Sequence, residues 1–223
     1  MTASLAYCLR RTHCRTSAAG RRPLGEVNME HTVRTARALE HVRVAIVVAN
    51  EGVEEVELLQ LWRAVVNAGG RAEVVATLPG FVETMHHLDR GDRFPVDQVT
   101  DWAREEDYDA AVLPGGVVNP DRLRTDAAAV DFLMATFEAG KPVAAICHGP
   151  LTLVDGDLLA GRTVTSSPSI RSDLRNARAH WLDESVVVCR RGINTLVTGR
   201  GARDLPAFCE CLTEELGRVD APV

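Results

Sequence analysis

Short, almost continuous runs of apolar residues alternate with longer helix-like segments along most of this chain. The clearest run, Val42 to Ala49, is interrupted only by Arg43. A run that is apolar on both faces is typical of a strand buried inside a parallel sheet. The segment that follows it, Glu54 to Ala68, predicts a helix that ends at Gly69-Gly70. The apolar residues of this segment that fall close to one helical face are Val56, Leu59, Trp62 and Val66.

The same two kinds of segment recur to the end of the chain, with no internal repeat. A helix is expected from Thr125, as its cap, through Ala139, with Asp126 in the first turn and Gly140 at the end. This alternation of strands and helices predicts an α/β fold with a largely parallel sheet. The remaining expected strands are 71–76, 110–113, 143–146, 162–165, 185–189 and 193–198. The remaining expected helices are 96–107, a segment after His148 and 204 to about 216. Residues 79–95 are expected to form a loop or a small hairpin.

Length and composition exclude several classes of protein. The 223 residues fit one large domain, and 46% hydrophobic with 25% charged residues exclude disorder across the whole chain. A net charge of −6 gives no electrostatic basis for binding nucleic acid, and no apolar run is long enough to span a bilayer. Six cysteines are too few for a disulfide-built scaffold, so reduced thiols and a cytoplasmic location are expected.

The first 25 residues differ from the rest, because they carry five arginines and no acidic residue before Glu26. This composition weakly resembles an organellar transit peptide. The alternatives are a disordered tail, or a start codon placed too early with Met29 as the true start. The expected organisation is an N-terminal extension over 1–40, one domain over 41–217 and a short tail over 218–223. Cys8 and Cys14 are given no functional role.

The most unusual strand exit is AAICHGP, residues 144–150. A buried strand ends there at Cys147 and turns at once into a helix, with Ala145 and Gly149 two positions away on either side. Small residues at these positions are the steric requirement of a nucleophile elbow, whose central residue projects from the sheet. A helix N-terminus behind Cys147 is expected to lower the pKa of its thiol. The alternative is a buried structural cysteine.

Two other strand exits meet at the same end of a parallel sheet. In LPGG (113–116), the N–H groups of Gly115 and Gly116, together with that of His148, are placed to form an oxyanion pocket beside the cysteine. The alternative is an ordinary tight turn. In NEGVEE (50–55), acidic residues cluster at a helix N-terminus, where the helix dipole favours them without any catalytic role.

Taken together, these stretches resemble the DJ-1/PfpI family, and its PfpI-type intracellular proteases most closely. The resemblance covers about Val42 to Leu216. It implies a flavodoxin-like three-layer sandwich of helices around the sheet, in the wider class of glutamine amidotransferase-like proteins, and dimers or assemblies of dimers. The matching segments are ANEGVEEVEL (49–58), HLDRGDRFPVD (87–97), DYDAAVLPGG (107–116), NPDRLR (119–124), GKPVAAICHGP (140–150), GRTVTSSPSI (161–170) and DLPAF (204–208).

The resemblance also implies roles for individual residues. The nucleophile of the family falls on Cys147 and its neighbouring histidine on His148. The acid that touches the sulfur falls on Glu54, with a one-residue ambiguity toward Glu55. A further acid, which reaches the histidine from an adjacent subunit in PfpI-like members, falls on Asp121, so the site is expected to be complete only in the assembly.

These roles imply a cysteine-dependent hydrolase that acts on peptide or amide bonds, or on glycated or small carbonyl substrates, as a peptidase, deglycase or glyoxalase in stress defence. Cys147 attacks the carbonyl, His148 moves the proton and a protonated Glu54 donates to the sulfur. Two other functions stay open. One is a redox sensor in which Cys147 oxidises without turnover, and the other is a chaperone-like oligomer with a vestigial pocket. No cofactor, metal, nucleic acid or membrane partner is expected.

Several positions depart from the family pattern or carry no expected chemistry. NARAHWLDE (176–184) places Arg178 and His180 where Gly and a variable residue are expected, and TGRGARD (198–204) lacks a proline and a serine. These changes put the shape of the substrate in doubt. His86-His87 is not expected to bind metal, and Cys209 and Cys211 diverge on one helix, which implies neither zinc nor a disulfide.

Overall fold

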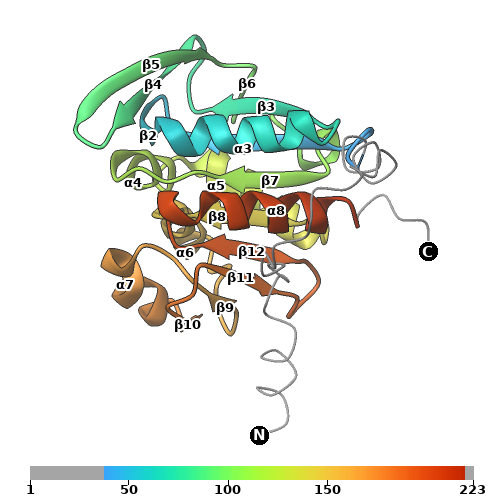
Figure 1. Cartoon of the computed structure of the whole chain (residues 1–223), viewed down its shortest axis with the longest axis vertical. Helices are drawn as coiled ribbons and strands as arrows, with labels where there is room; N and C mark the ends of the chain where they lie inside the picture. The colour runs from blue at the N-terminus through green and yellow to red at the C-terminus, as the bar shows by residue number, and fades with distance from the viewer. Residues whose placement is uncertain (1–37, 219–223) are drawn as a thin grey trace, which may run out of the picture.

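The structure, a computed structural model, describes residues 38–218. It consists of a central sheet between two layers of helices (Figure 1), as the sequence predicted. The expected N-terminal extension, including Cys8 and Cys14, lies almost entirely outside the described residues. Within the described part, no helix combines the length and the apolar character needed to cross a membrane.

The central sheet has seven strands in the order β11-β12-β8-β7-β1-β3-β6. All neighbouring strands are parallel except β11, which pairs antiparallel with β12 at one edge. Six of the seven predicted strands belong to this sheet, and the 162–165 strand forms a small separate sheet. The bounds are β1 Arg43–Val48, β3 Arg71–Ala76, β6 Gln98–Val99, β7 Ala110–Leu113, β8 Val143–Ile146, β11 Val186–Cys189 and β12 Leu196–Gly199, with β9 Thr163–Val164 and β10 His180–Trp181 in the small sheet.

The near-continuous apolar runs are explained by burial on both faces of the sheet. In β1, Val44, Ile46 and Val48 pack into one hydrophobic cluster, whereas Ala45 and Val47 pack into the other. All five side chains are fully buried. Burying a valine or isoleucine side chain contributes about 1.5–3 kcal/mol to the stability of the fold, so a polar residue on either face of β1 would be destabilising.

Helices α3 and α8 cover one face of the sheet, and α5, α6 and α7 contribute to the core on the other face (Figure 1). The bounds of the helices are α3 Glu55–Asn67, α4 Val118–Leu123, α5 Ala127–Glu138, α6 Thr152–Asp155, α7 Arg171–Asn176 and α8 Leu205–Leu216, with short 3-10 turns at η1 Glu105–Asp107, η2 Gly149–Leu151, η3 Pro168–Ile170 and η4 Ala202–Asp204.

Helix α3 packs through a different face from the apolar one that the sequence pattern suggested. Its buried side chains include Glu57, Leu58, Leu61 and Val65. The face named above is largely at the surface, with Val56, Trp62 and Val66 each 37–40% exposed. The helix therefore has apolar residues on two sides, and the buried side carries a carboxylate.

The expected small hairpin is present and extends into a second sheet. Strands β4 (Phe81–His86) and β5 (Asp89–Pro95) form the hairpin, and β2 (Glu51–Glu54) pairs parallel with β4. Glu55 fastens the hairpin to α3, because its Oε2 accepts hydrogen bonds from Thr84 Oγ1 at 2.7 Å and from the Asp92 amide at 2.6 Å. These bonds hold the pKa of Glu55 below its usual range.

Two local predictions were wrong. Residues 96–107 do not form a helix; they hold β6, a turn and η1, because Asp97 bonds to Val74 and anchors this segment at the sheet edge. The cap of α5 is Asp126, whose side chain accepts from the Ala129 amide at 2.8 Å, and not Thr125. Strands β2, β6 and β10 and helices α4 and α7 were not predicted.

Candidate active site

Cys147 occupies a nucleophile elbow at the end of β8. Its φ is 61°, in the left-handed region that a residue with a side chain seldom adopts. Its amide donates to the Gly199 carbonyl at 3.0 Å, which ties the turn to β12. A Cβ on Gly149 would collide with the Leu113 carbonyl oxygen, so only glycine fits there. The small residues that the sequence showed around Cys147 therefore serve the turn that projects its sulfur.

The His148 ring lies directly beside this sulfur. Its Nδ1 is 3.2 Å from Cys147 Sγ, and its Nε2 is 2.9 Å from the hydroxyl of Ser169. Burial lowers the pKa of His148, because a protonated ring is poorly solvated there. The ring is therefore neutral at physiological pH and can accept a proton at one nitrogen.

The acid at the sulfur is Glu57, which corrects the assignment to Glu54. Glu57 is 1% exposed, and its carboxylate bonds both to the thiol of Cys147 and, at 2.7 Å, to the amide of Gly115. Burial raises the pKa of Glu57 to about 7. Its carboxyl group is thus about half protonated at neutral pH.

Glu54 and Glu55 face the hairpin instead of the sulfur. Glu54 is the last residue of β2, and its Oε2 lies 3.3 Å from the His87 amide and 3.9 Å from the His87 ring. Glu55 bonds to the hairpin through Oε2, and its Oε1 lies 3.4 Å from His86 Nε2. The sequence signal for Glu57 was its place on the buried stripe of α3 with Leu58, Leu61 and Val65.

Two of the three amides expected to form an oxyanion pocket remain available. The Gly115 N–H is already bonded to Glu57, so it is not directed at a substrate oxygen. Gly115 instead supplies space, because a Cβ there would lie 2.7 Å from the Cβ of Cys147. The amides of Gly116 and His148 point to the sulfur. Gly116 has φ 87° and packs against the Gly52 carbonyl, which leaves no room for a side chain.

The pKa of the Cys147 thiol is raised, contrary to the expectation from a helix N-terminus. Burial is the main cause and the neighbouring Glu57 carboxylate the second, and both outweigh the amides of His148 and Gly116. The segment behind the cysteine is η2 followed by the four-residue α6, which is too short for a substantial dipole. Cys147 and His148 therefore form a neutral pair at rest.

Asp121 does not reach His148 within one chain. It lies near the start of α4, where its carboxylate is exposed and pairs with Arg124 at 3.1 Å. Its expected contact from an adjacent subunit stays a prediction. The buried polar residue of this helix is Asn119, which accepts from the Ala49 amide at 2.7 Å and donates to the Pro114 and Gly115 carbonyls. Asn119 thereby fixes the loop that carries the glycines.

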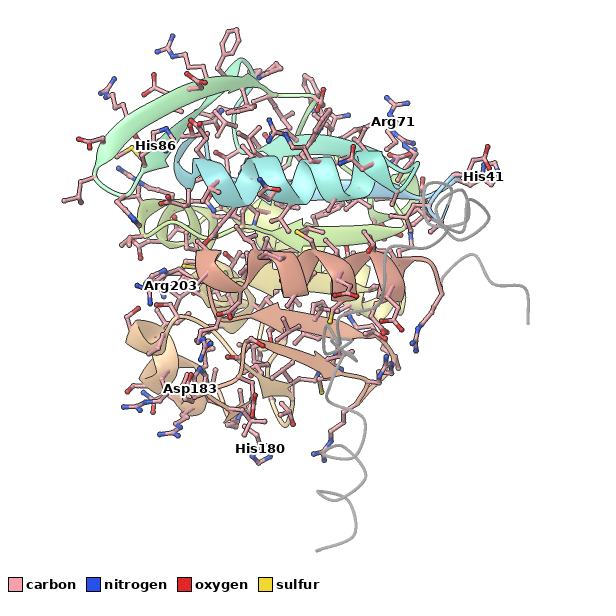
Figure 2. All side chains as sticks on the ribbon, viewed as in Figure 1. His41, Arg71, His86, His180, Asp183 and Arg203 are labelled. Atoms are coloured by element: carbon pink, nitrogen blue, oxygen red, sulfur yellow. The ribbon has the colours of Figure 1, made fainter. Side chains whose placement is uncertain are left out.

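The other features singled out in the sequence lie at several places in the fold. Arg178 adopts φ 64°, the conformation that suits the glycine expected there, and pairs with Asp157. Figure 2 shows His86 and Arg203 at the end of the molecule where the parallel strands finish, and His41 and Arg71 at the end where β1 and β3 begin. Neither Cys209 nor Cys211, both on α8, forms a disulfide within the described part of the chain.

Comparisons with known proteins agree with this fold. Uncharacterised proteins from Staphylococcus epidermidis and Staphylococcus aureus are each 39% identical over 176 residues, which is 78% of this chain and 97% and 98% of those proteins.

Among solved structures, one from Anabaena variabilis contains a DJ-1/ThiJ/PfpI-like and a ferritin-like domain. It matches with a TM-score of 0.72 and 33% identity over 79% of this chain, and this chain spans about half (48%) of that longer chain. DJ-1beta of Drosophila melanogaster matches in fold, with a TM-score of 0.70 and 24% identity over 79% of this chain and 90% of that one. The DJ-1/PfpI family model matches residues 42–215. With a family match over most of its length and a nucleophile elbow at Cys147, this chain belongs to the DJ-1/PfpI family.

Proposed function

We propose that this protein is a cysteine-dependent enzyme that attacks electrophilic carbonyl groups, in small carbonyl compounds, glycated groups or peptide bonds. The observation that carries the proposal is the contact of Cys147 Sγ with His148 Nδ1 at 3.2 Å, on an elbow that projects the sulfur from the sheet. A thiol with an adjacent neutral base is the arrangement that nucleophilic catalysis requires. The activity needs Cys147 reduced, a condition that the cytoplasm maintains.

The proposed reaction starts from the neutral pair. As the sulfur of Cys147 bonds to the carbonyl carbon, its proton passes to Nδ1 of His148, and the carbonyl oxygen takes up negative charge. The amides of Gly116 and His148 are the donors for that oxygen. With a peptide bond, the proton of His148 passes to the leaving amine as the C–N bond breaks, and water hydrolyses the resulting thioester. With methylglyoxal, the proton passes to the oxygen and gives a hemithioacetal. Transfer of its aldehyde-carbon hydrogen to the ketone carbon, through an enediol, gives a lactoyl thioester that water hydrolyses to lactate and the free thiol. The step requires no external oxidant or reductant.

Methylglyoxal separates carbonyl chemistry from peptide chemistry in one measurement. Its conversion to lactate consumes one water molecule and moves hydrogen from the aldehyde carbon to the ketone carbon, with no net redox change. We expect many equivalents of lactate per protein by proton NMR, and none after Cys147 is blocked with iodoacetamide. Lactate is the informative product, because loss of methylglyoxal alone also results from trapping by thiols. Absence of lactate from folded protein would exclude glyoxalase activity and direct the assay to peptides.

The redox-sensor alternative is less well supported by the same geometry. Oxidation by peroxide proceeds through the thiolate, and both burial and Glu57 raise the pKa of Cys147. A sensor is better served by a lowered pKa and greater access to solvent. For the chaperone-like alternative, the described residues offer no specific supporting observation.

We further propose that the protein forms a homodimer through the exposed apolar face of α3, made of Val56, Leu59, Trp62 and Val66. Trp62 lies in the middle of this face and is 40% exposed. Large apolar residues aligned on one helix mark an interaction site, and a second copy presents the same face around a two-fold axis. The family resemblance also implies dimers.

Replacing Trp62 by Lys should convert this dimer to monomer. Light scattering coupled to size exclusion measures the mass, and Trp102→Lys is the matched control, because Trp102 is 74% exposed and lies outside α3. We expect the control to keep the mass of the wild type. A wild-type monomer, or a dimer that survives Trp62→Lys with its affinity unchanged, would contradict the assignment of this face.

A further inference from the structure

Two serines after β9, Ser167 and Ser169, contact the Cys147–His148 pair within the same chain. The amide of Ser167 donates to the carbonyl of Cys147 at 2.9 Å. The hydroxyl of Ser169 lies 2.9 Å from His148 Nε2 and 2.9 Å from the hydroxyl of Ser167. Sulfur, imidazole and two hydroxyl groups therefore form one continuous hydrogen-bonded chain.

The backbone of this segment is anchored on both sides of the serines. Ser166 is fully buried, and its hydroxyl accepts from the indole nitrogen of Trp181 at 3.0 Å. On the other side, Pro168 starts the turn η3, and Ile170 packs into the core. Ser169 itself is exposed, so its side chain is held at the ring by a fixed backbone and not by packing around it.

Proton transfer from Cys147 requires one tautomer of His148, which the hydroxyl pair can accommodate. To take a proton from Cys147, Nδ1 must present its lone pair to the sulfur, which places the ring hydrogen on Nε2. Ser169 must then accept from Nε2–H and direct its own hydrogen elsewhere. The hydroxyl of Ser167, 2.9 Å away, can accept that hydrogen.

We propose that Ser169, oriented by Ser167, is the positioning residue that holds Nδ1 of His148 toward the thiol of Cys147. This inference deepens the proposed function and depends on it for its catalytic consequence. Ser169 has the place that an aspartate has in a Ser-His-Asp triad, but as a neutral acceptor. A neutral partner leaves the resting imidazole unprotonated, which agrees with the lowered pKa of His148.

The proposal differs from the expectation that Asp121 of an adjacent subunit orients His148. Nε2 already has a partner within the chain, and Asp121 is paired with Arg124. A carboxylate at Nε2 would raise the pKa of His148, whereas a serine does not. The two arrangements therefore predict different sensitive residues and a different charge on the ring.

Alkylation of Cys147 by iodoacetamide as a function of pH tests the positioning role without any substrate. We expect Ser169→Ala to slow alkylation at pH 7 roughly fivefold, the size of one lost hydrogen bond, and to shift the profile to higher pH. Ser169→Thr keeps a hydroxyl and should restore most of the rate. Ser172→Ala, at an exposed serine on α7, is the matched control and should behave as the wild type. Thermal melts establish that all variants are folded.

Two further readouts separate this inference from the proposed function. Nitrogen-15 NMR of the His148 ring should show hydrogen on Nε2 in the wild type and a mixture of tautomers in Ser169→Ala. If lactate is formed, kcat should fall in Ser169→Ala with KM unchanged. If the wild type turns over neither methylglyoxal nor glycated or peptide substrates but alkylation and tautomer still respond to Ser169, the proposed function fails and the positioning role stands.

The opposite pattern overturns the inference. Alkylation, ring tautomer and kcat that are unchanged in Ser169→Ala would show that the hydroxyl does not position His148. Loss of the same readouts in Asp121→Asn instead would assign the role to the adjacent subunit. If both variants retained the wild-type values, the ring would be held by its own packing, which also contradicts the proposal.

Discussion

Replacing Cys147 by Ala is expected to lower turnover by at least about a thousandfold, because the sulfur is the nucleophile at Nδ1 of His148 and the Ser169 hydroxyl lies at the opposite ring nitrogen, Nε2. His148, Gly116 and Glu57 would remain in place around an inert methyl group. Alanine is also small enough for the elbow, although it keeps the strain of the left-handed φ of 61°. The folded state should therefore survive, and the loss would be chemical.

Cys209→Ser is the matched control for this variant. Cys209 lies on α8, where it packs against the core with its sulfur 3.8 Å from the Gln60 carbonyl. Cys189 is a poorer control, because it is fully buried and accepts a hydrogen bond from the Thr163 amide. Initial rates of lactate formation, with melting curves for both variants, measure the effect. Full activity in Cys147→Ala would reject Cys147 as the nucleophile.

The position of Cys147 could be predicted from the sequence because the elbow is a local structure. A buried strand, a cysteine and small residues two positions to either side define it within seven residues. The same holds for the strands that are apolar on both faces, such as β1. In these segments a short stretch of sequence contains nearly all the steric information that the backbone needs.

The acid at the sulfur could not be placed in the same way, because its assignment depends on the rotation of α3. Each residue step turns a helix by about 100°, so Glu54, Glu55 and Glu57 point in different directions although they are adjacent. Packing against the sheet puts Glu57 on the buried side and turns Val56 and Trp62 outward. With apolar residues on two sides of α3, the sequence pattern did not determine which side faces the core.

Contacts between distant segments were the least predictable part of the site. Ser169 is 21 residues from His148 and reaches it because the segment after β9 is bonded to β12, through the Thr165 amide and the Thr198 hydroxyl, and to the carbonyl of Cys147. Likewise, β2 becomes a strand because it pairs with β4, about 30 residues later, and no local pattern marks it. The segment 96–107 illustrates the reverse case, since the edge of the sheet overrides a weak helical pattern there.

Replacing Glu57 by Gln is expected to stabilise the protein at alkaline pH and leave it almost unchanged at acidic pH. The pKa of Glu57 is raised to about 7 in the fold from 4.5 when unfolded, chiefly by burial. The native state thus binds the extra proton between these values, so this group's stabilisation is fully present below about pH 4.5 and is lost as the pH rises through about 7. A gap of 2.5 pKa units corresponds to about 3 kcal/mol.

Glutamine keeps the shape and the bonds of the protonated acid. Its amide oxygen can accept from the Gly115 N–H, and its NH₂ group can donate to the sulfur of Cys147. Removing the charge of Glu57 should lower the pKa of Cys147 and accelerate alkylation at pH 8 about tenfold, equivalent to one pKa unit. The same change at pH 5 should have little effect, because the wild-type carboxyl group is already protonated.

Glu54→Gln is the control that distinguishes the two carboxylates. Glu54 lies next to His87 and does not touch the sulfur, so its replacement should leave both the alkylation profile and the pH dependence of stability near those of the wild type. Urea denaturation at pH 5 and pH 8, with iodoacetamide kinetics at the same values, measures both effects. Equal behaviour of the two variants would reject the charge coupling between Glu57 and Cys147. A larger effect in Glu54→Gln would also identify Glu54, and not Glu57, as the acid beside the thiol.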